Sequence, residues 1–280
     1  MKICVGVIDG ATTYGIIEQG SFVRVKDKFR KKYKTFWDII NKNKFFPIRK
    51  AFQNKRDGIP IEKIQLLPPI SESSKIICVG INYPKIYENS FKPKPENIIL
   101  FSRFYETIVG HNKRLIRPPG VARHSFDYEG EIAVIIGKSG FKIPRKNAMS
   151  HVFGYTLFND GSVREWQRHS LLAGKNFLFS GSCGPYIVTK DEIVDFDDLL
   201  LETRVNGRTV QSTYAREMFF KIDEILSYIS HIFPLNPGDL IATGSPEGTG
   251  ANQAPPNFLM PGDSIEVSAS KLGSLQNIVE

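Results

Sequence analysis

The sequence has few cysteines and no hydrophobic run long enough to cross a membrane. Its three cysteines, Cys4, Cys78 and Cys183, are too scattered for a cysteine-based metal site, and their odd number argues against a disulfide framework. No apolar run approaches the roughly 20 residues that a membrane-spanning helix needs, and the apolar run at the N-terminus already ends at Asp9. We therefore expect a cytoplasmic protein with reduced thiols and no membrane partner.

Fingerprints of nucleotide and nucleic-acid binding are also missing. The glycine-rich loop at 244–250 lacks the residue order of a phosphate-binding loop, and no dinucleotide-binding glycine pattern stands at a strand-to-helix junction. The net charge is +8, but the densest basic cluster, 26–34, is not accompanied by a nucleic-acid-binding motif. A solvated lysine-rich surface explains this charge better, and the charge would also attract a small anionic substrate.

The remaining composition is that of a soluble globular protein, with 41% hydrophobic and 24% charged residues. Short strands separated by glycine and proline turns fill the C-terminal third, and one convincing amphipathic helix is expected over 221–233. This pattern predicts a β-rich α+β fold. Strand and helix signals in residues 1–70 indicate a small N-terminal α+β domain, and the polar segment at 71–74 marks the start of a main domain, 71–280.

In the main domain, two carboxylate side chains lie at the start of a strongly hydrophobic segment. Glu129 and Glu131 open the run 132–136, which is apolar on both faces and rich in β-branched residues, so it predicts a strand buried on both sides. Side chains alternate along a strand, so both glutamates point to the same face. Two buried carboxylates so close together repel each other, and a divalent cation would resolve that repulsion.

A third acid closes this stretch. Asp160 follows a strand predicted over 151–158, within the turn sequence Asn-Asp-Gly. Three oxygen ligands without a Cys or His partner favour Mg²⁺, Mn²⁺ or Ca²⁺ over zinc. Spacing alone leaves a second interpretation equally open, in which the glutamates are ordinary edge-strand acids and Asp160 only makes a turn.

Several motifs, taken together and in order, resemble the fumarylacetoacetate hydrolase family from about Lys75 to the end of the chain. A short helix expected over 163–172 places Arg164 and Gln167 on one side, and a glycine-rich segment with Lys175 follows it. The motifs that carry the resemblance are Val79–Tyr83, Asp127–Gly137, Gly154–Asp160 with Arg164 and Gln167, Gly174–Phe177, and Leu235–Pro246.

The resemblance implies a fold, a site and a chemistry. The fold is a mixed β-roll with a smaller N-terminal domain, usually in a homodimer, and the substrates are small 2-oxo acids or β-diketo acids. A metal ion, Mg²⁺ or Mn²⁺, is expected to bind and to stabilise an enolate. The implied site residues are the metal ligands Glu129, Glu131 and Asp160, the active-site lysine Lys175, and the substrate-binding residues Tyr83, Arg164, Gln167 and Thr243.

One segment departs from the family pattern. Members with a catalytic lid carry a His/Glu pair after the first strand of the domain, but here Ile86 and Asn89 stand at those positions. Isoleucine cannot carry a proton, so we expect Glu88, one position away, or Tyr87 to replace the pair, or the water-activating step to be lost. Among the histidines, His124 and His111 are the candidates closest to the metal stretch.

The leading hypothesis is a metal-dependent hydrolase that cleaves a C–C bond of a small 2-oxo or diketo acid, of the acylpyruvate or fumarylpyruvate type. A decarboxylase, isomerase or hydratase acting on a related 2-oxo acid is the nearest alternative. Because the lid His/Glu pair is absent, a third hypothesis is a protein that binds an oxo acid without turnover.

Overall fold

The computed structural model describes residues 1–42, 51–52, 58–84, 86–87, 90–91 and 93–280. Strands outnumber helices, which confirms the β-rich α+β class, and no helix in these ranges is long and apolar enough to cross a membrane. The α-helices are α1 (Asp27–Lys32), α2 (Phe36–Lys42), α3 (Arg145–Ala148), α4 (Arg164–Gln167), α5 (Leu171–Lys175) and α6 (Ile222–Ile232).

A large mixed sheet of 12 strands forms the centre of the molecule. Most neighbours pair antiparallel, while β19 pairs parallel with β6. In spatial order its main path is β4 (Ile59–Pro60), β3 (Ser21–Arg24), β2 (Ala11–Glu18), β1 (Lys2–Ile8), β16 (Gly181–Thr189), β14 (Val152–Asn159), β13 (Gly130–Ile136), β19 (Leu240–Ala242), β6 (Ile76–Gly80) and β9 (Ile99–Arg103), with β5 (Gln65–Leu67) beside β1 and β10 (Ile108–Val109) beside β16.

A second sheet of five strands packs against one face of the large sheet. Two small ribbons complete the strands: β12 (Phe126–Asp127) with β15 (Ser162–Val163), and β7 (Ile86–Tyr87) with β8 (Ser90–Phe91). The second sheet has the order β11 (Arg114–Leu115), β21 (Gly273–Val279), β20 (Ser264–Ala269), β17 (Leu200–Val205) and β18 (Arg208–Tyr214).

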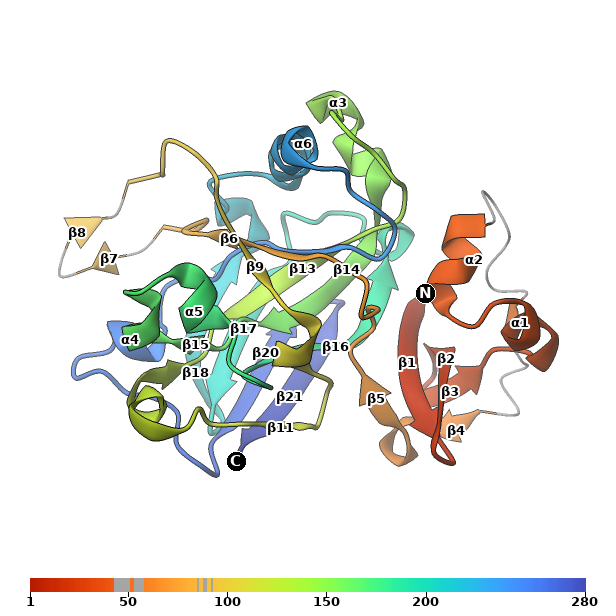
Figure 1. Ribbon diagram of the computed structural model, residues 1–280, viewed down its shortest axis with the longest axis horizontal. Coiled ribbons are helices and arrows are strands. Elements are labelled where there is room, and N and C mark those ends of the chain that lie inside the picture. The colour runs from red at the N-terminus through yellow and green to blue at the C-terminus, as the bar shows by residue number, and fades with distance from the viewer. Residues whose placement is uncertain (43–50, 53–57, 85, 88–89, 92) are drawn as a thin grey trace.

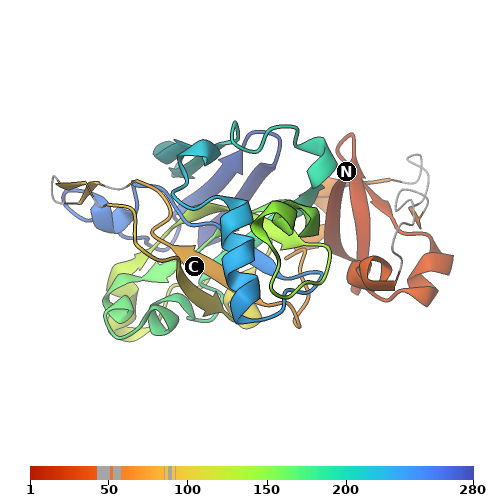
Figure 2. The ribbon, with the colours of Figure 1, turned by 90° about the horizontal axis from the view of Figure 1, so that it is seen from above.

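Every residue of β13 is buried, which confirms the predicted strand that is apolar on both faces. Ile132 and Val134 point into a core that includes residues of the second sheet and of α6. Ala133 and Ile135 point to the opposite core, which includes residues of α2. Helix α6 lies beside α3 in both views (Figures 1 and 2). Because side chains alternate along the strand, Glu131 shares the face of Ala133.

The N-terminal strands are not separated from the main sheet. Figure 1 shows β1 to β4 on one side of the molecule, and β1 pairs with β16 through Lys2 and Ile3. Strand β5 pairs with β1 on the same edge. Residues 1–70 and the main domain therefore share one sheet, and their division into two domains stays a prediction.

Two local predictions around the site are wrong. The single helix expected over 163–172 is divided into a short strand, β15, and two short helices, α4 and α5. Lys175, expected in a glycine-rich loop, is the last residue of α5. Other elements are confirmed with small shifts at their ends, among them α6 and the hairpin of β17 and β18 around Asn206-Gly207.

Candidate metal centre

The candidate site lies where β13 begins and β14 ends. Antiparallel pairing sets Gly130 opposite Asn159, so the residue before β13 and the residue after β14 lie side by side. The backbone N–H of Asp160 donates to the carbonyl oxygen of Glu129 over 2.8 Å and joins the two strand ends. The fold thus brings together Glu129 and Asp160, which are 31 positions apart in the chain.

The three predicted ligands meet at this point. One carboxylate oxygen from each of Glu129, Glu131 and Asp160 lies within 4.8 Å of the other two. These residues are only 8%, 1% and 0% exposed, respectively. Buried carboxylate oxygens at this spacing suit a hard divalent cation. Their role as metal ligands stays a prediction.

Of the three acids, Glu131 has the fewest contacts that stabilise a negative charge on its carboxylate. Burial raises the pKa of its carboxyl well above the usual range, and the neighbouring carboxylates of Asp160 and Glu129 raise it further. Among the described contacts, its Oε2 accepts one hydrogen bond, from the backbone N–H of Gly244 over 2.8 Å. Gly244 has a φ of 96°, and a Cβ there would lie 2.8 Å from the side chain of Asn82, so this donor requires glycine.

Lys175 lies inside the carboxylate cluster. Its Nζ donates to Oε2 of Glu129 over 2.6 Å and to Oδ2 of Asp160 over 2.5 Å. Burial alone would lower the pKa of this amine, but the carboxylates of Asp160 and Glu129 outweigh burial and raise the pKa above its ordinary value. Helix α5, capped by the Ser170 hydroxyl, therefore presents a charged ammonium to the site.

Arg164, at the start of α4, connects the carboxylates of Asp127 and Glu129. Its Nε donates to Oδ2 of Asp127 over 2.7 Å, and its Nη1 donates to Oε1 of Glu129 over 2.6 Å and to Oε1 of Gln167 over 3.3 Å. The Nη2 atom is buried and has no hydrogen-bond partner among the described residues. The side chain of Gln167 is thus hydrogen-bonded to Arg164, whereas Nη2 of Arg164 has no hydrogen-bond partner among the described residues.

Tyr83 and Thr243 lie together next to Glu131. The side chain of Tyr83 is buried, and burial followed by the charge of Glu131 raises the pKa of its hydroxyl, while a side-chain hydrogen bond with Thr243 lowers that pKa by less. The hydroxyl of Thr243 donates to the carbonyl oxygen of Ile132 over 2.7 Å. The Thr243 hydroxyl therefore connects Tyr83 to the sheet.

The remaining acid–base candidates are Glu88, Tyr87, His111 and His124. Glu88 lies outside the described residues, and the structure describes only the backbone of β7 and β8 on either side of it. Nδ1 of His111 accepts a hydrogen bond from the backbone of Gln276, and the ring of His124 lies beside Arg123. Neither histidine has a described contact with the three acids.

Two residues of the site carried no predicted role. Asp127 is fully buried and accepts backbone hydrogen bonds from Gly250 and Ala251, so it ties the loop after β19 to Arg164. Arg103, the last residue of β9, bonds Asp160. The sequence signal that could have identified these two residues is a charged residue directly next to a segment predicted to be a buried strand.

The donor set fits a divalent ion. Four buried carboxylates, Asp127, Glu129, Glu131 and Asp160, stand against three cationic side chains, Arg103, Arg164 and Lys175, so the cluster is one positive charge short. Glu129, Glu131 and Asp160 would hold the ion, because their oxygens converge. A bound Mg²⁺ or Mn²⁺ would polarise a carbonyl oxygen and stabilise negative charge on it.

The mixed β fold and the buried Glu-Glu-Asp cluster at its strand ends define an α+β class with a carboxylate site that could hold a divalent metal. Residues 75–280 match the family model described as "Fumarylacetoacetate (FAA) hydrolase C-terminal". The chain therefore belongs to the fumarylacetoacetate hydrolase family, as the motifs predicted.

Relatives in this family are named for several reactions. The chain is 37% identical over 236 residues to the Bos taurus protein "Oxaloacetate tautomerase FAHD2A, mitochondrial", covering 83% of this chain and 74% of that one. Identity to the Homo sapiens protein of the same name is 36% over 235 residues, covering 82% and 74%.

Solved structures give the same family. A fumarylacetoacetate hydrolase from Exiguobacterium antarcticum matches with a TM-score of 0.84 and 32% identity, covering 100% of this chain and 99% of that one. A 5-carboxymethyl-2-hydroxymuconate delta-isomerase from Mycobacterium smegmatis matches with a TM-score of 0.79 and 26% identity, covering 100% and 98%. The relatives are enzymes, but their names do not agree on hydrolysis.

Proposed function

We propose that this protein is a Mg²⁺- or Mn²⁺-dependent enzyme that interconverts the keto and enol forms of a small 2-oxo dicarboxylic acid. The observation that carries the proposal is the buried cluster in which Glu129, Glu131 and Asp160 converge beside the ammonium of Lys175. Such a site stabilises an enolate, the species through which keto and enol forms interconvert. The tautomerase names of the mammalian relatives support oxaloacetate as the first substrate to test.

Three side chains have the donors that this reaction needs. Nζ of Lys175 is an ammonium that can donate a hydrogen bond, or a proton, to an enolate. The free Nη2 of Arg164 can bind a substrate carboxylate without breaking its bonds to Asp127 and Glu129. The hydroxyl of Tyr83, buried beside Glu131 and Thr243, is a further hydrogen-bonding group for a substrate oxygen. Burial of these groups excludes water from the reacting atoms.

Cleavage of a C–C bond, the leading hypothesis from the sequence, is the second candidate. The similarity to the Exiguobacterium antarcticum hydrolase favours it. Hydrolysis needs an activated water molecule, and Ile86 and Asn89 occupy the positions of the lid His/Glu pair. Tautomerisation needs proton transfer but no attacking water, so it does not depend on that pair for water activation.

The test is a substrate panel with the purified protein in Mg²⁺ or Mn²⁺ and in EDTA. Decay of the ultraviolet absorbance of enol-oxaloacetate reports tautomerisation, pyruvate formation reports decarboxylation, and loss of the diketone absorbance of acylpyruvates and fumarylpyruvate reports hydrolysis. We expect metal-dependent acceleration of enol decay without pyruvate formation.

Two other results would change the proposal. Rapid loss of acylpyruvate with no effect on enol-oxaloacetate would replace tautomerisation by C–C hydrolysis. Binding of oxalate that requires Mg²⁺, without turnover of any substrate, would favour the oxo-acid-binding protein.

The homodimer and the cytoplasmic location stay proposals beside the function. Sedimentation velocity of the purified protein would measure the first, and fractionation of the source cells the second.

A further inference from the structure

Arg103 is a buried cation beside the metal centre that no predicted role includes. It is the last residue of β9, the strand at one end of the large sheet. Its side chain is 0% exposed, as is that of Asp160, its partner in an ion pair of 2.7 Å. A fully buried guanidinium is costly unless its donors are satisfied, so its contacts indicate what it does.

The guanidinium of Arg103 is held by four hydrogen bonds. Nη1 donates to Oδ1 of Asp160 over 2.7 Å and to the carbonyl oxygen of Gly161 over 2.9 Å. Nη2 donates to Oγ of Ser180 over 2.8 Å, and Nε donates to Oγ1 of Thr107 over 3.3 Å. The guanidinium is planar and rigid, so these contacts fix its orientation.

The two hydroxyl groups that hold Arg103 are themselves oriented. Ser180 Oγ donates its proton to the carbonyl oxygen of Phe177 over 2.7 Å, and Thr107 Oγ1 donates to that of Phe104 over 2.7 Å. Their lone pairs are therefore left to accept from the guanidinium. A Cβ at Gly181 would lie 2.8 Å from Nη2 of Arg103, so the chain also leaves space for it.

The carboxylate of Asp160 is divided between two cations. Oδ1 faces Arg103, and Oδ2 faces Nζ of Lys175 in the space shared with Glu129. Because Arg103 is fixed by its own contacts, it keeps Asp160 from rotating about its terminal bond.

We propose that Arg103 is a positioning residue for metal binding, which fixes Oδ1 of Asp160 and thereby directs Oδ2 into the carboxylate cluster. This role rests on the metal-binding part of the proposed function. It does not depend on which reaction the enzyme performs.

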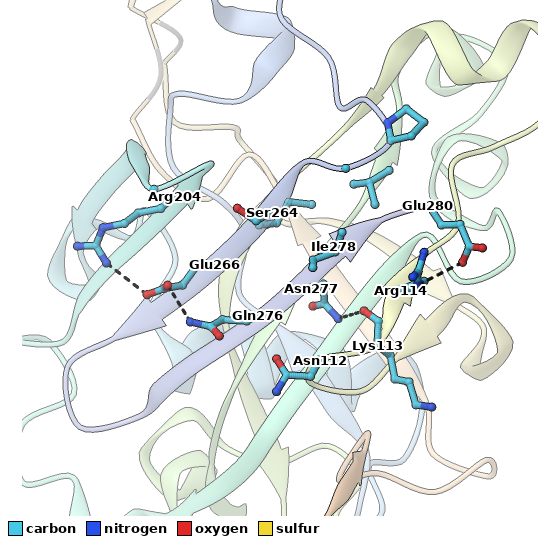
Figure 3. A pocket seen from close by; sticks show the side chains of 15 residues that line it. Asn112, Lys113, Arg114, Arg204, Ser264, Glu266, Gln276, Asn277, Ile278 and Glu280 are labelled. Carbon is cyan, nitrogen blue, oxygen red and sulfur yellow. Dashed lines mark hydrogen bonds and ion pairs between the residues drawn. The ribbon is translucent and has the colours of Figure 1, made fainter. Parts of the chain in front are cut away.

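Arg204 provides a matched control on the outer face of the second sheet. Figure 3 shows Arg204, Glu266 and Gln276 in a row that lines a cleft of about 690 Å³. Nη1 of Arg204 lies 3.4 Å from Glu266, and Nη2 lies 2.8 Å from Glu202. The side chain is 33% exposed and has no described contact with the metal centre.

The test compares Arg103→Lys with Arg204→Lys by calorimetric titration of the full chain with Mn²⁺. Lysine keeps the positive charge but loses the fork of the guanidinium, so a change in affinity reports geometry rather than charge. Residues that orient a metal ligand typically contribute about tenfold to hundredfold to affinity, and we expect Arg103→Lys to weaken Mn²⁺ binding by that factor. Arg204→Lys should bind Mn²⁺ as the wild type does.

Two further measurements separate positioning from a general loss of structure. Ser180→Ala removes one acceptor of Arg103 and should weaken Mn²⁺ binding by a smaller factor, about threefold, which keeps the test decisive if Arg103→Lys does not fold. In the same titration, Arg103→Lys should still bind one Mn²⁺ per chain at the weaker affinity, whereas a partly unfolded protein would show fewer than one site per chain.

Wild-type affinity in both Arg103→Lys and Ser180→Ala would overturn the positioning role while leaving the metal centre in place. No Mn²⁺ binding by the wild type would overturn the metal centre, and the positioning role with it.

Discussion

The metal centre has two sides that differ in how their charges are balanced. On the paired side, Asp127, Glu129 and Asp160 each accept at least one charged hydrogen bond, from Arg103, Arg164 or Lys175. On the open side, Glu131 accepts one backbone hydrogen bond among the described residues and has no ion pair with any of them.

The difference indicates what each side contributes. The paired side is held by its own ion pairs, so its geometry exists before metal or substrate binds. The open side has a buried carboxylate without a cation, which is costly in isolation. We therefore expect the metal ion to supply the missing partner of Glu131 on the open side.

The largest effect is expected from Lys175→Met, which removes the charge but keeps much of the length of this paired-side residue. Turnover should fall by about 10²- to 10³-fold, the loss typical of removing one donor to a developing oxyanion. Mn²⁺ affinity should be retained or increased, because an ammonium no longer competes for Glu129 and Asp160. Steady-state kinetics and calorimetry measure the two effects.

A comparable substitution away from the site is Lys190→Met, which removes a lysine that bonds only the backbone of Met149 among the described residues. It should leave both quantities unchanged. Loss of Mn²⁺ binding in Lys175→Met would mean that the paired side needs this ammonium for its assembly.

Glu131→Gln, on the open side, should reduce Mn²⁺ affinity by about a hundredfold or more, since it removes a direct ligand rather than an orienting residue. The metal-free variant should melt at or above the wild-type temperature, because a buried and poorly compensated carboxylate is removed. Calorimetric titration and thermal melting check both outcomes. Glu266→Gln, on the outer sheet face, is the control, and equal affinities of the two variants would remove Glu131 from the ligand set.

Ile86→His combined with Asn89→Glu tests the sequence segment that departs from the family. If the segment is a lid that has lost its acid–base pair, hydrolysis of an acylpyruvate should increase by about a hundredfold, within the range that general acid–base groups contribute. The single variant Ile86→His is the control, with a smaller gain expected. No gain in the double variant would show that the pair alone does not restore water activation.

The smallest effect is expected from Thr243→Val. The hydroxyl of Thr243 donates to Ile132, so its loss should destabilise the fold by about 1 kcal/mol and change KM less than about threefold. Thermal melting and kinetics test this. A large rise in KM without loss of stability would support Thr243 as a substrate-binding residue, the role that the family resemblance implies.

The convergence of the three acids was predictable from the sequence because it follows from strand geometry. Glu129 and Glu131 precede a buried run, Asp160 ends the next predicted strand, and neighbouring antiparallel strands bring such ends together. The family motifs then favoured the metal over the alternative of edge-strand acids.

The residues around these acids were harder to predict from the sequence. Gly174 suggested a loop, whereas the Ser170 cap and the contacts of α5 with α4 make Lys175 the end of a helix. The link between Arg103 and Asp160 joins residues 57 positions apart. No local pattern encodes which acid a buried arginine will meet, because that depends on the packing of β9 against α5 and of α5 against β15.

A crystal of the wild-type protein soaked in Mn²⁺ tests the central claim most directly. The anomalous signal of Mn²⁺ should give one strong peak bonded to oxygens of Glu129, Glu131 and Asp160, with Arg103 still on Oδ1 of Asp160. A peak that leaves out Glu131, or no peak at this cluster, would contradict the account.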